Sequence, residues 1–216
     1  MRGRILTALL ATACPLTAAH GAGTEMFAVS PAQSLEAPGV RVVVDHNKWS
    51  PIFFDEKNAG IQIILHGERI AVDGDVRLNP TPEQWDPVPT FIDRSVQTEP
   101  DQIVVRAAYP DAGLRYRIRV APEGTGFRIA VDLDKPLPPS LAGKAGFNLD
   151  FLPTAYFGKA YYLDGAPGLF PRNANGPMAT DGSGDPRPLA SGGRSITLSP
   201  EDPDTRVTIT SDKGAL

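Results

Sequence analysis

Residues 102–133 read QIVVRAA-YPDAG-LRYRIRV-APEGTG-FRIAVDL, which is three runs of seven residues separated by two short connections rich in Pro and Gly. In the middle run, Leu114, Tyr116, Ile118 and Val120 alternate with three arginines. A period of two places apolar side chains on one face of a strand and charged side chains on the other. The stretch therefore predicts three antiparallel strands joined by tight turns, with one face on a core.

Short β-rich runs continue on both sides of this stretch. They lie at residues 40–45, 61–66, 68–73, 76–78, 146–151, 195–198 and 205–210. Gly67 predicts a tight reversal or a bulged strand, and Asp73-Gly74-Asp75 predicts another turn. With 21 Gly and 22 Pro among 216 residues, the chain favours many short strands over helices. We expect an all-β fold, an antiparallel β-sandwich with long loops rich in Pro and Gly.

The N-terminus has the order of a secretory signal peptide. Arg2 and Arg4 precede an apolar run at residues 5–13, and small residues follow as cleavage sites. We expect a signal peptide at residues 1–22, a leader at 23–39 and a β-sandwich accessory domain at 40–216 that reads as truncated at its C-terminal end. A secreted or periplasmic location follows. Cys14, the only cysteine, lies in the signal, so a lipoprotein is a minor alternative.

Charge and composition exclude several classes of partner. The chain carries 21 basic and 25 acidic side chains, a net charge of −4, without any run of like charges. Nucleic acid needs a concentrated basic face, so we expect no nucleic-acid partner. No stretch after the N-terminus reaches the roughly 18 apolar residues of a membrane span. With His46 and His66 the only histidines outside the signal and no further cysteine, we expect no metal site and no cofactor.

Two groups of acidic residues have the spacing of functional sites. Asp132 and Asp134 are two residues apart on a predicted strand, so both carboxylates point to one face, as paired acids do in glycoside hydrolysis. Residues 181–185 (DGSGD) begin like a calcium loop, but Pro186 and Gly192 stand where that loop needs Gly and Glu. The favoured interpretation is a solvated strand end for the Asp132 and Asp134 pair, and a flexible loop rich in Gly for residues 181–185.

Aromatic residues are the candidate carbohydrate-binding groups. Sugars pack their CH groups on flat aromatic rings while their hydroxyls need polar partners. Trp49 and Trp85 lie in predicted loops bounded by Pro, and the segment 147–162 supplies Tyr156, Tyr161 and Tyr162. The alternative, which large aromatic residues favour in general, is that these rings fold inward and pack in the core or at an interface.

Several segments in order resemble the N-terminal region of large secreted bacterial proteins of glycoside hydrolase family 9. They are residues 73–78 (DGDVRL), 82–87 (PEQWDP), 146–149 (GFNL), 156–159 (YFGK), 168–172 (GLFPR) and 175–178 (NGPM). The resemblance implies that an immunoglobulin-like module and an (α/α)₆ catalytic barrel follow in the parent protein. It also implies an inverting hydrolase of β-glucans, whose catalytic base motif is Asp-Ala-Gly-Asp. Here residues 111–114 read DAGL in a hairpin turn, so no catalytic residue carries over.

The expected function is therefore a non-catalytic accessory module of a secreted, cellulase-like glycosidase. Its expected partners are the immunoglobulin-like and catalytic modules of the same chain, with β-glucan as the glycan. One alternative is a free-standing carbohydrate-binding protein. A second is a mutarotase-like sugar enzyme that uses His46 or His66 with Asp132, although a fold alone does not confer a function.

Overall fold

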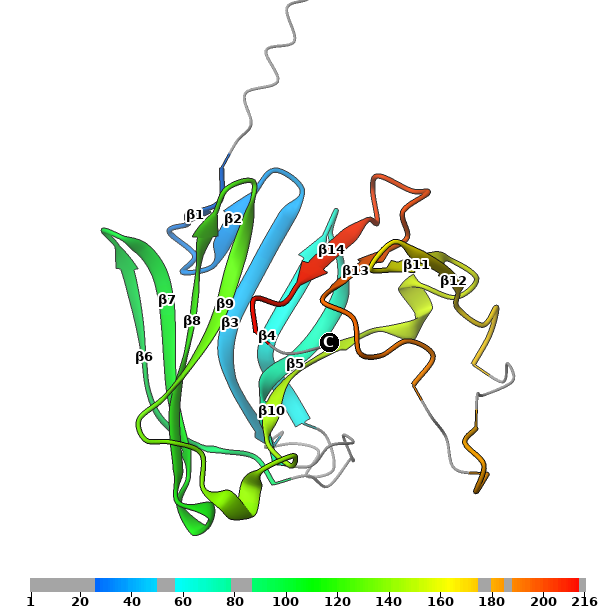
Figure 1. Ribbon diagram of the computed structural model, residues 1–216. Coiled ribbons are helices and arrows are strands. Elements are labelled where there is room, and N and C mark those ends of the chain that lie inside the picture. Colours follow the sequence, from blue (N-terminus) through cyan, green and yellow to red (C-terminus); the bar gives the residue numbers. More distant parts are fainter. Residues whose placement is uncertain (1–25, 50–56, 79–86, 175–179, 185–187, 214–216) are drawn as a thin grey trace, which may run out of the picture.

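The computed structural model describes residues 26–49, 57–78, 87–174, 180–184 and 188–213 (Figure 1). The predicted signal peptide at residues 1–22 lies outside the described residues. The strands form three antiparallel sheets, which we call sheets A, B and C. Sheet A has the order β1 (Ala28–Val29), β2 (Leu35–Ala37), β3 (Val40–Trp49), β4 (Lys57–Leu65), β5 (Glu68–Arg77) and β10 (Gly146–Phe151).

Sheets B and C have four strands each. Sheet B has the order β6 (Thr90–Thr98), β7 (Asp101–Tyr109), β8 (Leu114–Glu123) and β9 (Gly126–Leu133). Sheet C has the order β12 (Ala166–Leu169), β11 (Ala160–Leu163), β13 (Ser195–Leu198) and β14 (Val207–Thr210). Short 3₁₀ turns lie in three connections, at η1 (Pro110–Ala112), η2 (Pro139–Leu141) and η3 (Pro153–Ala155). The predicted all-β, sandwich-like fold is confirmed.

Sheet B contains the three-stranded meander that residues 102–133 predict. β8 pairs with β7 on one side and with β9 on the other, in antiparallel register throughout. Leu114, Tyr116, Ile118 and Val120 are at most 3% exposed, because their side chains all leave β8 on the same face. The period of two in the sequence thus corresponds to the inner and outer faces of this sheet, and the prediction of a meander is confirmed.

The main core lies between the inner faces of sheets A and B, which Figure 1 shows as two layers. Each sheet supplies β-branched and aliphatic side chains that are buried in one cluster. Sheet A contributes Leu35, Val42, Val44, Ile61 and Val76, and sheet B contributes Ile103, Val105, Leu114, Ile118 and Val120. Two antiparallel sheets that bury their apolar faces against each other form a β-sandwich.

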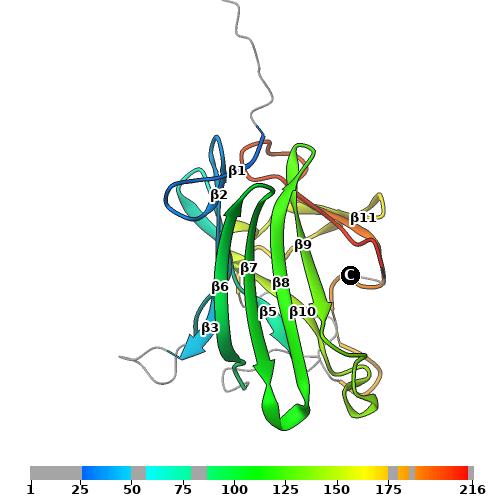
Figure 2. The same ribbon diagram turned by 90° about the vertical axis from the view of Figure 1, so that its left-hand side faces the viewer.

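Sheet C closes the side of the sandwich where β9 and β10 are the edge strands, and it lies on the β9 side in Figure 2. A second cluster there is built on Ile63, Ile70 and Ala71, and Phe127 of β9 and Val207 of β14 pack against it. An ion pair between Arg128 of β9 and Asp212, which follows β14, also joins sheet B to sheet C. Sheet C is therefore bound to both layers of the sandwich.

The region around β5 gives one confirmed prediction and one correction. His66 and Gly67, with φ of +49° and +86°, form the two-residue turn between β4 and β5, so the predicted reversal is confirmed. The predicted turn at Asp73-Gly74-Asp75 is wrong, because these residues lie inside β5. Asp73 has φ of +55°, and the β4–β5 register shifts between Ile61 and Ile63. The Asp and Gly residues here accommodate a β-bulge.

Several strands of the structure have no counterpart in the sequence prediction. β1 and β2 lie within the expected leader and place Phe27 and Leu35 in the core. β6 follows the Pro-rich stretch at residues 80–89, and the β11–β12 hairpin lies within a segment that is rich in Gly and Pro. These strands are short or lack alternation, so tertiary pairing decides their conformation.

A buried carboxylate links the two layers. Asp75 of β5 is 2% exposed and accepts hydrogen bonds from the Tyr116 hydroxyl of β8 (2.7 Å), the Val76 N–H (2.7 Å) and the Asn47 N–H of β3 (3.3 Å). Burial raises the pKa of Asp75, and the bond from Tyr116 opposes this rise. Nearby, the Tyr109 hydroxyl donates to the Val76 carbonyl (2.8 Å). These bonds fix β5 against both β3 and sheet B.

We predict that Tyr116→Phe lowers the free energy of unfolding by about 1–3 kcal/mol at about pH 8, because the buried carboxyl of Asp75 loses its hydrogen bond from β8. The folded pKa of Asp75 is raised, so its contribution to stability falls as the pH rises above the ordinary aspartate value of about 3.9. The Tyr116 hydroxyl stabilises the ionised form and limits this fall. The deficit of the variant should thus be larger at about pH 8 than at about pH 4 in urea denaturation.

Tyr162→Phe is the matched control, because it also removes a tyrosine hydroxyl but from a side chain that is 43% exposed. We expect its unfolding free energy to follow that of the native protein at both pH values. A Tyr116→Phe deficit of equal size at both pH values would contradict the ionised hydrogen bond to Asp75.

Candidate functional site

Two of the predicted carbohydrate-binding aromatics lie inside the protein. Tyr156 and Tyr161 are 5% and 9% exposed and form a cluster with Leu198 on the inner face of sheet C. Phe170 packs between them, with ring centroids 6.3 Å from Tyr156 and 4.8 Å from Tyr161. Burial raises the pKa of Tyr156 to about 12. Their position agrees with the alternative interpretation, in which these rings pack in the core.

The two tryptophans give no surface that can be described. Trp85 lies outside the described residues. Trp49 is the last residue of β3 rather than part of a loop, and its side chain also lies outside the described part of the chain. A role in carbohydrate binding stays a prediction for both.

Tyr162 is the exposed member of the predicted set. It lies on β11, its side chain is on the face opposite to Tyr161, and it is 43% exposed. The register of sheet C places Pro167 of β12 on one side of Tyr162 and Thr197 of β13 on the other, and Thr208 of β14 follows Thr197. One row across the outer face of sheet C thus reads Pro167, Tyr162, Thr197 and Thr208.

Hydroxyl groups continue beside this row. The Thr197 and Thr208 hydroxyl oxygens are 3.0 Å apart and share a hydrogen bond. Ser195 pairs with Thr210 two residues further along the same two strands, so both lie on the same face. Sequence reasoning did not single out these hydroxyls. The sequence pattern that could have predicted them is the alternation of polar and apolar residues in Ser195-Ile196-Thr197-Leu198 and Val207-Thr208-Ile209-Thr210. This alternation gives sheet C an apolar inner face and a hydroxyl-rich outer face.

The carboxylate pair at the end of β9 is bound by arginines. Asp132 Oδ2 lies 3.0 Å from Arg117 Nε and 2.6 Å from Arg119 Nε, and these bonds lower the pKa of Asp132. Asp134 lies 4.0 Å from Arg115. Ion pairing holds a carboxylate in its charged form, whereas an acid catalyst at neutral pH needs a raised pKa. This arrangement agrees with the favoured interpretation of a solvated surface pair.

The two histidines do not meet Asp132. His46 lies on β3 in sheet A, where its Nδ1 is 2.8 Å from Asp45 Oδ1 and its ring stacks on Phe91 at 4.1 Å. His66 lies in the exposed turn between β4 and β5. Asp132 is on the outer face of sheet B. The groups named for a mutarotase-like reaction therefore lie on different sheets.

The calcium-like segment forms a local turn. The Ser183 N–H donates to Asp181 Oδ1 (2.8 Å), and Asp185 lies outside the described residues. Across the described ranges, no three side chains of His, Cys, Asp or Glu are grouped as they would be around a metal ion.

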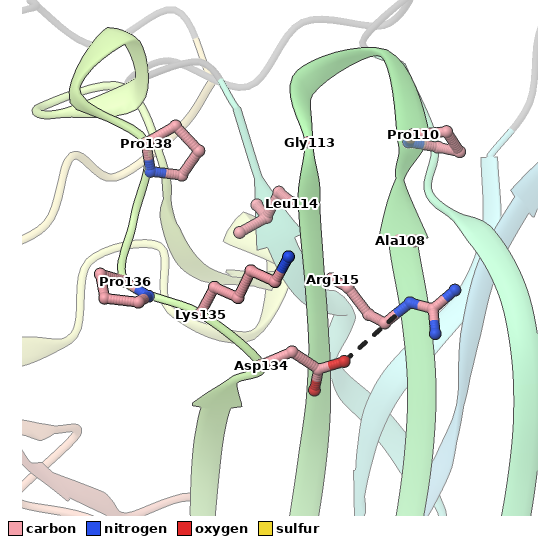
Figure 3. A pocket seen from close by; sticks show the side chains of 9 residues that line it. All are labelled: Ala108, Pro110, Gly113, Leu114, Arg115, Asp134, Lys135, Pro136 and Pro138. Atoms are coloured by element: carbon pink, nitrogen blue, oxygen red, sulfur yellow. Dashed lines mark ion pairs between the residues drawn. The ribbon is translucent and has the colours of Figure 1, made fainter.

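A cavity of about 360 Å³ lies where the chain leaves β9 (Figure 3). The η1 turn bounds one side, and the Pro-rich segment at residues 136–138 bounds the other. Arg115, Asp134 and Lys135 are the charged residues that line it, and the figure shows the Lys135 side chain extending between β8 and the Pro-rich segment. The cavity is thus lined by prolines and other apolar groups together with three charged side chains.

The chain was compared with known proteins. No model of a protein family matches it, and neither curated protein sequences nor solved structures give a significant match. Within the described residues, no helix is long and apolar enough to cross a membrane.

Gly168 lies opposite Tyr161 in the β11–β12 hairpin, and an added Cβ there would overlap the Tyr161 ring. We predict that Gly168→Ala lowers the free energy of unfolding by about 1–3 kcal/mol, because the ring is held against Phe170 and has to shift. Urea denaturation measures this loss. Gly146→Ala, also in a strand but with no atom within 4 Å of the added Cβ, is the control and should be near neutral. Equal stability of both variants would contradict the packing of Tyr161.

Proposed function

We propose that this chain is a non-catalytic β-sandwich module of a secreted glycosidase of the family 9 type, and that it holds glycan through the outer face of sheet C. The module would pack on the immunoglobulin-like and catalytic modules of the parent chain and present β-glucan to them. The parent protein rests on the resemblance of segments such as residues 146–149 and 156–159. A secreted or periplasmic location rests on the signal-like N-terminus.

The observation that supports glycan binding is the exposed ring of Tyr162 beside a row of hydroxyls. An exposed aromatic ring offers a flat apolar surface for the CH face of a sugar. Thr197 and Thr208 offer donors and acceptors in the same plane, because side chains of adjacent strands lie about 5 Å apart across a sheet. An open sheet face with one ring and several hydroxyls suits an extended sugar chain better than it suits a small molecule, which needs a concave pocket.

The test is a titration of the full chain with soluble β-glucan and xyloglucan oligosaccharides, followed by calorimetry. We predict that Tyr162→Ala weakens binding about tenfold, since loss of ring stacking costs on the order of 1 kcal/mol. Thr197→Val, which removes one hydroxyl and keeps the shape, should weaken it by a smaller factor.

Phe147→Ala is the matched control for the loss of an aromatic ring. Phe147 is 38% exposed but lies on β10 in sheet A, so this variant should bind like the native protein. Absence of heat with every oligosaccharide would contradict glycan binding. An equal loss for Tyr162→Ala and Phe147→Ala would contradict the assignment to sheet C.

The parent-chain part of the proposal has its own test. An open reading frame that continues beyond codon 216 into a helical barrel would support a module of a larger glycosidase. A stop codon with no barrel gene nearby would favour the alternative of a free-standing carbohydrate-binding protein.

A further inference from the structure

The outer face of sheet B carries a group of cations that the proposed glycan face of sheet C does not include. We define the arginine stripe as Arg106 of β7 together with Arg115, Arg117 and Arg119 of β8. Their side chains are 54%, 64%, 52% and 39% exposed. Alternate residues of a strand lie about 6.6 Å apart, so the three arginines of β8 form one row along the face that Figure 2 turns toward the viewer.

The stripe brings like charges together. Arg106 is the direct cross-strand partner of Arg117, and like charges in that position destabilise a sheet. Four arginines face three carboxylates, since Asp93 pairs with Arg106, Asp134 with Arg115, and Asp132 with both Arg117 and Arg119. Exposed ion pairs contribute little stability, so these pairs do not account for the stripe.

The guanidinium groups keep unused donors. Arg117 donates to Asp132 through Nε, and Arg106 and Arg115 approach their carboxylates through Nε at 3.0 and 4.0 Å. Within the described residues, the Nη groups of these three side chains form no hydrogen bond. Each guanidinium therefore offers a planar pair of donors to an incoming anion, and this geometry matches a carboxylate in two-point contact.

The row on β8 leads to the cavity at the end of β9. Arg115 lines that cavity together with Lys135, whose side chain extends into the space between β8 and the Pro-rich segment (Figure 3). The cavity adds a cation and a partly open volume of about 360 Å³ to the end of the row. A linear ligand could therefore lie along β8 with one end or one side group in the cavity.

We infer that the outer face of sheet B binds an anionic glycan, a polymer of uronic acids whose carboxylates pair with the arginine stripe and with Lys135. The stripe alternates with carboxylates such as Asp132 and Asp134, which accept hydrogen bonds from sugar hydroxyls and repel a dense row of phosphates more strongly than the more widely spaced carboxylates of a uronate chain. A uronate carries carboxylates and hydroxyls together, whereas a nucleic-acid backbone has a dense row of phosphates. The mixture of arginines and carboxylates on this face thus favours an acidic glycan over nucleic acid.

This inference goes beyond the proposed function and does not depend on Tyr162. The two surfaces belong to different sheets, so neutral β-glucan reports on sheet C and an acidic glycan reports on sheet B. Failure of one assay therefore leaves the other interpretable.

The test is calorimetry of the full chain with polygalacturonate, with dextran sulfate, with neutral β-glucan and with duplex DNA. The native protein should bind polygalacturonate with an affinity that falls at high salt, because exposed charge pairs are screened. The double variant Arg117→Gln/Arg119→Gln should weaken this binding about tenfold or more, and leave β-glucan binding unchanged. Asp132→Asn should strengthen it, because that change frees two arginines.

Arg41→Gln is the matched control. Arg41 lies on β3 in sheet A, its side chain is 52% exposed like that of Arg117, and its Nε is 2.9 Å from Glu36 Oε1. The control should change polygalacturonate affinity by less than about twofold. Arg117→Lys keeps the positive charge but loses the planar pair of donors. Its polygalacturonate affinity should lie between those of the native protein and the double variant. This milder variant tests the inference even where the double variant unfolds.

Four results would overturn the inference. The first is a polygalacturonate affinity that is the same in the native protein, the double variant and Arg117→Lys. The second is a loss of affinity in Arg41→Gln as large as that in the double variant. The third is weaker polygalacturonate binding by Asp132→Asn, and the fourth is tighter binding of DNA than of polygalacturonate by the native protein. Tighter binding of dextran sulfate than of polygalacturonate would also overturn the choice of a uronate and indicate a sulfated glycan instead.

Discussion

The buried carboxylate of Asp75 constrains the relation between the two layers of the sandwich. A carboxylate that is 2% exposed has lost its hydration, and only hydrogen bonds from the protein replace it. Its donors come from three strands, with Tyr116 on β8, Asn47 on β3 and Val76 on β5 itself. A sliding of sheet B over sheet A would break the bond from Tyr116 and leave the buried carboxyl of Asp75 with donors from sheet A alone. The apolar core provides most of the favourable burial, whereas this network specifies the alignment.

Sheet C depends on that alignment. The cluster of Ile63, Ile70 and Ala71 receives Phe127 from sheet B and Val207 from sheet C, so it exists only when the edges of sheets A and B lie at the correct separation. Once sheet C covers this side, its own apolar side chains are buried and its hydroxyl-rich face points outward. The packing of sheet C buries Tyr156 and Tyr161 in one cluster. Tyr162 is exposed, since it follows Tyr161 on β11 and neighbouring residues of a strand point to opposite faces.

The molecule therefore presents two polar sheet faces of different chemistry. The outer face of sheet C combines one aromatic ring with uncharged hydroxyls and suits a neutral glycan. The outer face of sheet B combines arginines with carboxylates and leads to a cavity with a further cation. Such a division would let one module contact two components of a mixed polysaccharide. The proposed binding groups all lie on strands, where their spacing is set by the sheet rather than by loops.

By itself, the sequence determined the meander of sheet B, because Leu114 to Val120 alternate with arginines and each period of two defines a buried and an exposed face. It also determined β10 and β13, whose bounds match the predicted runs. At Gly67 the sequence allowed a reversal or a bulged strand, and the structure has the reversal. Only the tertiary structure decided the course of β6, which lacks a clear alternation, and of β11 and β12, which are four residues long, because such strands form through pairing with neighbours. It also turned Asp73-Gly74-Asp75 into a bulge within β5, since pairing with β4 and β10 outweighs the local turn preference. The same holds for the candidate site, because composition marks a segment as aromatic, but only the pairing of β11 with β12 and β13 decides which tyrosine faces solvent.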